Sequence, residues 1–160
     1  MARVALIFGL AAGFLAAPLL AYEPGDPAKL LETKNCGACD LSKSKLDGAV
    51  LDDAYLVNVN LSGATLIGAS LKRVYLLQAR LEDANLSKAD LTEGNLTNTV
   101  LTGAVLTGAV AKAASLVNAS AAGANFDNAV LTGAFLTRAN LRAATLRGAD
   151  LSGANLASAV

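Results

Sequence analysis

The residues with the clearest capacity for chemistry are Cys36 and Cys39, the only two cysteines of the chain. Spaced as Cys-x-x-Cys, they can form a disulfide, pack as two buried thiols, or carry out thiol–disulfide exchange. A redox site of this kind usually lies at a helix N-terminus within a βαβ unit, and no such pattern surrounds the pair. Haem attachment would need a histidine after the second cysteine, but Asp40 follows it. Two thiols are also too few for a structural zinc site.

Composition argues against other catalytic sites. The chain has no histidine, which excludes Ser-His and Cys-His nucleophiles. Carboxylate pairs occur at 52–53 and 82–83, but each includes a residue predicted at a solvated turn, where nothing would raise a pKa. The glycines recur at regular intervals rather than before a helix, so no phosphate-binding loop is predicted. We therefore expect a protein that is not an enzyme and that holds no cofactor or metal.

A five-residue period determines which elements position these residues. From Leu41 to Leu156, 21 of the 24 positions spaced by five are Leu, and the others are Phe126, Ala111 and Ala121. A small residue, Ala at 18 of the 24, lies two positions before each of them. Five residues advance about 140° net around an α-helix, and an odd spacing alternates between the two sides of a flat strand. The leucines can share one core only if the chain turns a corner once per repeat.

The turn residues support this interpretation. We call the leucine position of each repeat its centre and the residue two positions later its corner. Nine of the 14 glycines lie at corners, together with four asparagines. Gly and Asn tolerate the left-handed backbone that tight turns need. Because Phe126 is the next centre after Ala121, we expect its ring to fill the volume that Ala111 and Ala121 leave.

The repeats resemble the motif of the pentapeptide-repeat family, roughly Ala-Asp/Asn-Leu-x-x. Residues 84–88 (Ala-Asn-Leu-Ser-Lys) and 149–153 (Ala-Asp-Leu-Ser-Gly) match it, and the resemblance covers about residues 36–160. It implies an all-β solenoid, a right-handed quadrilateral β-helix with four repeats per turn and about six turns here. Residues 34–41 (Lys-Asn-Cys-Gly-Ala-Cys-Asp-Leu) are similar to the entry segment of exported or lumenal members. That similarity implies a structural role for the cysteine pair and leaves its oxidation state open.

The first 21 residues predict a secretory signal peptide. Arg3 precedes an apolar run from Val4 to Leu20, polar residues begin at Tyr22, and we expect cleavage after Ala21. The alternative is an uncleaved membrane anchor, because the run is near the lower length for spanning a bilayer. Export would place the protein in a periplasm, in a photosynthetic lumen or outside the cell, where a disulfide can form.

A short helix is predicted between the signal peptide and the repeats. Within the linker of residues 22–35, Asp26 can cap a helix, Pro27 suits its first position and Lys34 suits its last turn. Leu30 and Leu31 would give this helix an apolar side. We expect it to cover the open N-terminal end of the β-helix, which comprises residues 36–160.

Outward residues beside the centres are the ones available to a partner. If four repeats make one turn, centres twenty residues apart lie on the same face. One such face carries Tyr55, Val57, Tyr75 and Leu77, and Val117 and Phe135 continue its apolar character. A contiguous apolar patch is typical of an interface, although β-favouring residues on a solvated face would give the same pattern. Two copies of the chain could pair through this face or through the uncapped last turn.

The charge balance bears on nucleic-acid roles. The chain has 13 basic and 13 acidic residues, and loss of residues 1–21 would remove only Arg3. Some pentapeptide-repeat proteins resemble DNA and bind topoisomerases, which requires a strongly negative rod. No basic excess or aromatic set favours nucleic-acid binding either. We expect an exported structural or protein-interaction module with an unidentified protein partner. The alternatives are a thiol–disulfide redox protein using Cys36 and Cys39, and a DNA mimic.

Overall fold

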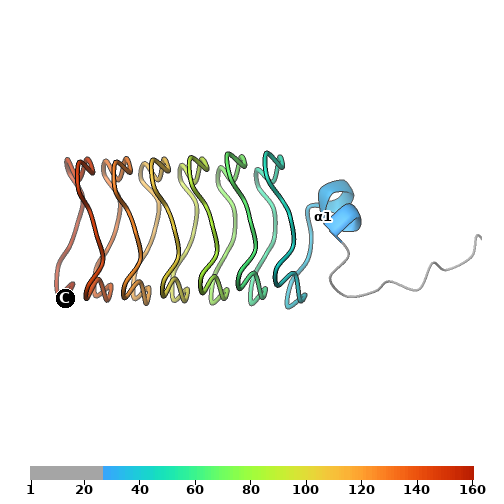
Figure 1. The fold of residues 1–160 in the computed structure, drawn as a ribbon, viewed down its shortest axis with the longest axis horizontal. Coiled ribbons are helices and arrows are strands. Elements are labelled where there is room, and N and C mark those ends of the chain that lie inside the picture. The colour runs from blue at the N-terminus through green and yellow to red at the C-terminus, as the bar shows by residue number, and fades with distance from the viewer. Residues whose placement is uncertain (1–26) are drawn as a thin grey trace, which may run out of the picture.

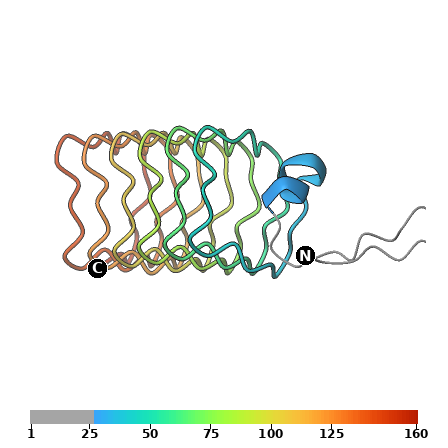
Figure 2. The ribbon, with the colours of Figure 1, turned by 45° about the vertical axis from the view of Figure 1, so that its right-hand side comes forward.

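The backbone bends sharply at every fifth residue, as the period predicts. The computed structural model describes residues 27–160, which form a coil of stacked, four-sided turns, seen from two directions in Figures 1 and 2. The predicted signal peptide, residues 1–21, and the first residues of the predicted linker lie outside the described residues.

Neighbouring turns are joined by parallel bridges between residues twenty apart. They begin at Asn35↔Tyr55 and continue without interruption to Phe135↔Asn155. In the repeats that are followed by another turn, the centre and the corner donate backbone hydrogen bonds to that turn, as Leu86 N does to Val105 O (2.7 Å) and Lys88 N to Thr107 O (3.0 Å). Four repeats therefore complete one turn, and each face of the coil is a ladder of very short parallel strands.

Every corner residue from 38 to 158 has a positive φ, including those that are neither Gly nor Asn. Lys43, Arg73, Glu93 and Ala113 have φ values between 52° and 59°. Residues with a Cβ pay a steric penalty there. The ladder hydrogen bonds and the buried centres on both sides of each corner hold the backbone in this conformation whatever the side chain.

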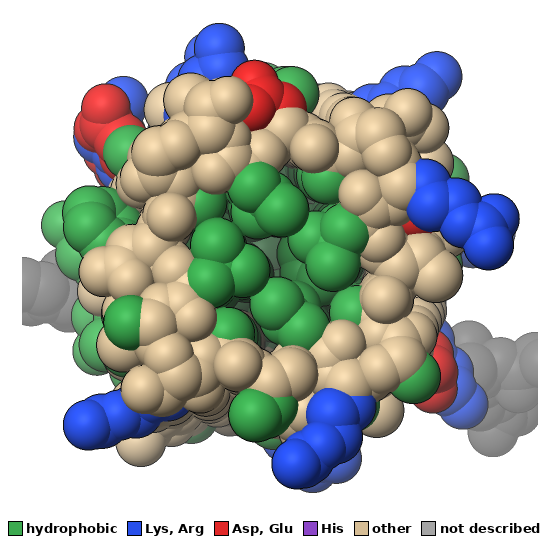
Figure 3. Space-filling model, turned by 90° about the vertical axis from the view of Figure 1, so that its left-hand side faces the viewer, with side chains coloured by type: hydrophobic (Ala, Val, Ile, Leu, Met, Phe, Trp, Pro, Cys, Tyr) green, Lys and Arg blue, Asp and Glu red, His purple; other side chains and the backbone are tan. Residues whose placement is uncertain are grey.

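Centres and their small neighbours form one continuous core. Leucine centres from Leu41 to Leu136 are at most 2 % exposed, and Ala111, Ala121 and Phe126 are also buried. The filling of volume by the Phe126 ring stays a prediction. The core is open at the last turn, where Leu156 is 39 % exposed. Viewed along the axis from that end, apolar side chains occupy the middle of the coil and basic side chains lie around its rim (Figure 3).

Helix α1, Pro27–Thr33, precedes the coil and lies at its N-terminal end (Figures 1 and 2). Leu30 is 1 % exposed and belongs to the core, whereas Leu31 is 47 % exposed. Of the two leucines predicted to form the apolar side of this helix, only Leu30 packs against the coil. Lys34 ends α1 in a left-handed conformation and donates its N–H to Leu30 O (2.7 Å).

Candidate interaction surface

The Asp or Asn that directly precedes many centres accepts hydrogen bonds within its own repeat. The backbone N–H of the residue after each centre takes no part in the ladder between turns. In the repeat of Leu86, Asn85 Oδ1 accepts this N–H from Ser87 at 3.0 Å and also accepts the Ser87 hydroxyl at 2.6 Å. Thr92 makes the same two bonds to Asp90. These outward carboxylates and amides stabilise the repeat, so they are not free ligands for a partner.

Outward side chains also meet between turns at a separation of 18 residues. Ser70 Oγ donates to Asp52 Oδ1 at 2.6 Å, and the hydroxyls of Thr97 and Ser115 lie 2.9 Å apart. Tyr55 follows the same register, because its Cε1 lies 3.0 Å from the position that a Cβ on Gly37 would occupy. The lack of a side chain at Gly37 thus makes room for the Tyr55 ring.

The tyrosine patch, which we define as Tyr55, Val57, Tyr75 and Leu77, lies on one face over two adjacent turns. Tyr55 and Tyr75 pair directly in a parallel bridge and are 49 % and 48 % exposed, while Val57 and Leu77 are half-buried. The structure therefore brings the four predicted residues together. Phe135, 49 % exposed, lies on the same face three turns beyond Tyr75.

This patch lacks the side-chain caps that satisfy other repeats. Tyr55 and Tyr75 occupy the position of Asn85 but carry no short side-chain carbonyl that could accept the N–H after the centre. Accordingly, the N–H groups of Val57 and Leu77 have no acceptor among residues 27–160. The patch combines an exposed apolar surface with two free backbone donors, a combination that suits contact with a protein surface carrying carbonyl groups.

A neutral ion pair borders the patch at the preceding corners. Arg73 Nε lies 2.7 Å from Asp53 Oδ1, and Arg73 Nη2 lies 2.8 Å from Asp53 Oδ2. These hydrogen bonds lower the pKa of Asp53, and the charge of Lys34 adds to the effect more weakly. Asp53 in turn raises the pKa of Arg73, with a smaller contribution from Glu93. The alternating signs at positions 53, 73 and 93 are visible in the sequence, but this column was not predicted from it.

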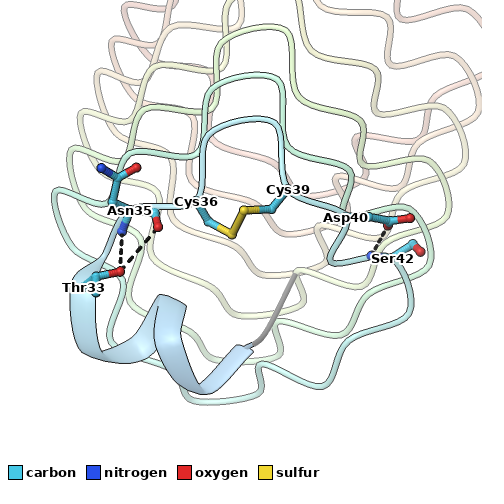
Figure 4. The surroundings of a disulfide bond; sticks show 6 residues. All are labelled: Thr33, Asn35, Cys36, Cys39, Asp40 and Ser42. Carbon is cyan, nitrogen blue, oxygen red and sulfur yellow. Dashed lines mark hydrogen bonds between the residues drawn. A yellow bond between two sulfur atoms is a disulfide. The ribbon is translucent and has the colours of Figure 1, made fainter. Parts of the chain in front are cut away.

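Cys36 and Cys39 form a disulfide across the first corner, with their Cα atoms 5.4 Å apart. The structure thereby selects one of the three predicted states of the pair. Both residues are buried, at 2 % and 3 % exposure, and their side chains point into the coil (Figure 4). The nearby Asp40 points outward, and hydrogen bonds from Ser42 and, more weakly, Asn60 lower its pKa. An enclosed disulfide offers no open approach to an attacking thiolate.

The carboxylate pairs lack the properties of catalytic acids. Asp52 accepts hydrogen bonds from Ser70 Oγ and from the N–H of Lys72, and the bond from Ser70 is the main cause of its lowered pKa. A general acid needs the opposite shift. Residues 27–160 contain no cluster of three or more side chains suited to holding a metal ion. Within the same range, no helix has the length and apolar character needed to span a bilayer.

Solved structures similar to this chain include several repeat proteins. A pentapeptide repeat protein (Rfr23) from the cyanobacterium Cyanothece 51142 is 27 % identical, with coverage of 81 % of this chain and 96 % of that one, and a TM-score of 0.39. One from the Arabidopsis thaliana thylakoid lumen is 30 % identical over 68 % of this chain and 70 % of that one, with a TM-score of 0.29. HetL, from Nostoc sp. strain PCC 7120 and involved in heterocyst differentiation regulation, is 31 % identical over 78 % and 75 %, at 0.24.

These low TM-scores carry no conclusion about function, and no curated protein matches the chain. The family model for pentapeptide repeats matches eight copies over residues 35–73, 79–114 and 122–157, more than half of the chain. Members of this family form right-handed quadrilateral β-helices, in agreement with the twenty-residue turns observed here. The chain belongs to the pentapeptide-repeat family.

Proposed function

We propose that this protein is an exported, non-enzymatic interaction module whose contact surface is the tyrosine patch. The observation that carries the proposal is the pairing of two half-exposed tyrosines on adjacent turns. Exposed aromatic groups with a neutral polar border are typical of protein interfaces, which are enriched in Tyr and depleted of charge at their centres. Family membership agrees, because pentapeptide-repeat proteins are generally structural or interaction modules.

The direct test replaces Tyr75 and Leu77 together by Lys. Both side chains point outward, so the double variant should fold normally and lose its protein partner. Val105→Lys with Thr107→Lys is the matched control, because these residues occupy the corresponding two positions on the opposite face. Quantitative pull-downs from the native compartment, together with circular dichroism, compare the two variants. Partner profiles that are unchanged in the Tyr75/Leu77 variant would contradict the proposal.

Export is proposed from residues 1–21, whose apolar run ends at small and polar residues typical of a cleavage site. The destination would be a periplasm, a photosynthetic lumen or the extracellular space. The buried Cys36–Cys39 disulfide supports an oxidising compartment. Mass spectrometry of the protein purified from its native cells should find an N-terminus at Tyr22. A full-length mass would instead indicate a membrane anchor.

We further propose that residues 22–35 are a linker with a capping helix, and that residues 36–160 form a β-helix of about six turns. Support for capping comes from Leu30, whose buried side chain joins the core at the end where α1 lies. A cap covers apolar side chains and strand edges that would otherwise be exposed. Leu30→Ser should increase hydrogen exchange in the first turn more than in the middle of the rod. Equal exchange throughout would refute capping.

The redox alternative has less support than a structural disulfide. Both sulfurs belong to nearly inaccessible residues, and the first corner lacks a flanking helix N-terminus that would stabilise a thiolate. A structural bond should resist mild dithiol reductants and give no turnover in a disulfide-reductase assay. The topoisomerase-binding alternative has no support from charge, since acidic and basic residues are balanced.

A further inference from the structure

The corners beside the tyrosine patch carry a column of alternating charge. Along the rod axis its members are the corners Asp53, Arg73 and Glu93, preceded by Lys34, which follows α1 one residue past the corner register. Asp53 and Arg73 form the ion pair described above, while Lys34 acts electrostatically on Asp53 and Glu93 on Arg73. The signs are therefore positive, negative, positive and negative over consecutive turns.

This charge column is complementary to itself when one copy is reversed. A two-fold axis across the face, between Asp53 and Arg73, exchanges the order of the turns. It sets Asp53 opposite Arg73 of the second copy, and brings Lys34, which also donates to Asp52 O (3.1 Å), near Glu93 of the second copy. Every basic side chain thus meets an acidic one, as an isologous interface requires.

The same operation matches the remaining parts of the face. Tyr55 comes opposite Tyr75 of the second copy, and Val57 comes opposite Leu77. At the following corners Asn58 comes opposite Gln78, so that uncharged amides meet at that border. Their side-chain carbonyls can accept hydrogen bonds from the free N–H groups of Val57 and Leu77. Apolar, amide and charged strips therefore all face their counterparts in a single arrangement.

We propose that two copies of this chain associate side by side and antiparallel through the tyrosine patch and its charge column. The proposal rests on the proposed function of this face and names a second copy as the partner. The overlap is about four turns, or ~19 Å at the spacing of stacked strands. With about four outward residues per turn on this face, the contact has fewer residues than the roughly 20–30 per partner of stable complexes, so we expect a dimer that dissociates on dilution.

Other pairings of two copies are electrostatically weaker. A parallel arrangement sets the charge column against the amide border and forms no ion pairs. Pairing through the last turns would bring together Arg138, Arg142 and Arg147, which form no ion pair within residues 27–160. Asp150 is the one acidic residue among positions 138–160, so like charges would dominate that contact.

Single charge reversals test the antiparallel register. Asp53→Arg places Arg opposite Arg73 of the second copy, and Arg73→Asp places Asp opposite Asp53. The corner backbone accepts both changes, since Arg73 and Asp53 themselves occupy such corners at φ 53° and 62°. In low salt, each variant alone should dimerise at least about tenfold more weakly than the unmodified chain. Sedimentation velocity gives the dissociation constants, and circular dichroism checks the fold.

An equimolar mixture of the two variants provides the decisive measurement. At positions 53 and 73 both facing pairs in the heterodimer are then Arg against Asp, so native mass spectrometry should detect heterodimers and few homodimers. The double variant, Asp53→Arg with Arg73→Asp, should dimerise like the unmodified chain. Phe135→Lys lies outside the overlap and should also leave the dimer intact. A mixture that stays monomeric, or single variants that dimerise normally, would overturn the antiparallel dimer.

These outcomes are independent of the test of the proposed function. If the charge variants behave like the unmodified chain while Tyr75→Lys with Leu77→Lys removes a different protein in pull-downs, the face remains an interaction surface and the dimer is wrong. If the mixture recovers dimerisation, the second copy is confirmed as an occupant of the face.

Discussion

The same substitution, Ala to Gly, should have opposite effects at two positions six residues apart. Ala113 is a corner with φ 52°, whereas Ala119 is a small inward residue with 1 % exposure and no positive φ. At Ala113, Gly removes the steric penalty of a left-handed L-residue, about 1–2 kcal/mol. Part of this gain is offset by the larger entropy of the unfolded chain, about 0.4–1 kcal/mol. The expected net result is a stabilisation of about 0.5–1 kcal/mol.

At Ala119, Gly removes a buried methyl group and also loosens the unfolded chain. Both effects destabilise, by about 1–2 kcal/mol together. Gly123→Ala completes the set, because this corner has φ 68° and no atom near the position of an added Cβ. Its cost is therefore confined to the backbone, and we expect a destabilisation of about 0.5–1 kcal/mol.

Urea unfolding followed by circular dichroism measures all three variants. For typical slopes the corner variants should move the midpoint by about 0.2–0.5 M, upward for Ala113→Gly and downward for Gly123→Ala, at unchanged slope. A lower midpoint for Ala113→Gly would refute the reasoning. It would mean that the hydrogen-bond ladder and the core impose the left-handed backbone of the corner without strain, so that the residue type at the corner does not affect stability.

Three further predictions concern the core and the acidic side chains. Gly94→Ala should destabilise because the new Cβ would lie 3.0 Å from Leu91 O and 3.3 Å from Val74 Cγ1, and a double-mutant cycle with Val74→Ala should recover part of the loss. Leu86→Asp should abolish the cooperative melt in circular dichroism, whereas Lys88→Asp at the adjacent exposed corner should not. Because the pKa of Asp52 is lowered in the folded state, its contribution is present above the ordinary value of 3.8 and is lost as pH falls below it. The free energy of unfolding should therefore fall less steeply with decreasing pH in Asp52→Asn than in the unmodified chain.

Much of the fold was predictable because each repeat carries several sequence signals for the same bend. A bulky centre, a small inward neighbour and a permissive corner all point to the same bend, so residues 41–156 specify it many times over. The corners also show the limit of that argument. Arg73 and Glu93 have no intrinsic preference for a left-handed backbone, and their conformations follow from the neighbouring turns.

The sequence predicted which residues form the tyrosine patch, but it did not predict the free backbone N–H groups there. Sorting by twenty placed Tyr55 beside Tyr75, because the bridges follow the same register. The free N–H groups of the patch depend on which N–H the ladder omits, and a sequence pattern does not give that. The contact of Tyr55 with Gly37 has an 18-residue separation that becomes apparent only once the turns are stacked. The oxidation state of Cys36 and Cys39 likewise required their positions in space.

The parallel bridges between residues twenty apart have a consequence for insertions and deletions. Adding five residues at a corner keeps every bulky centre in the interior, but it rotates all later residues to the adjacent side of the rod. The later parts of each outward column would then be displaced by a quarter turn, although the protein would remain folded. Adding twenty residues restores every column. Changes in length by whole turns should therefore preserve surface recognition, whereas changes by single repeats should preserve only the scaffold.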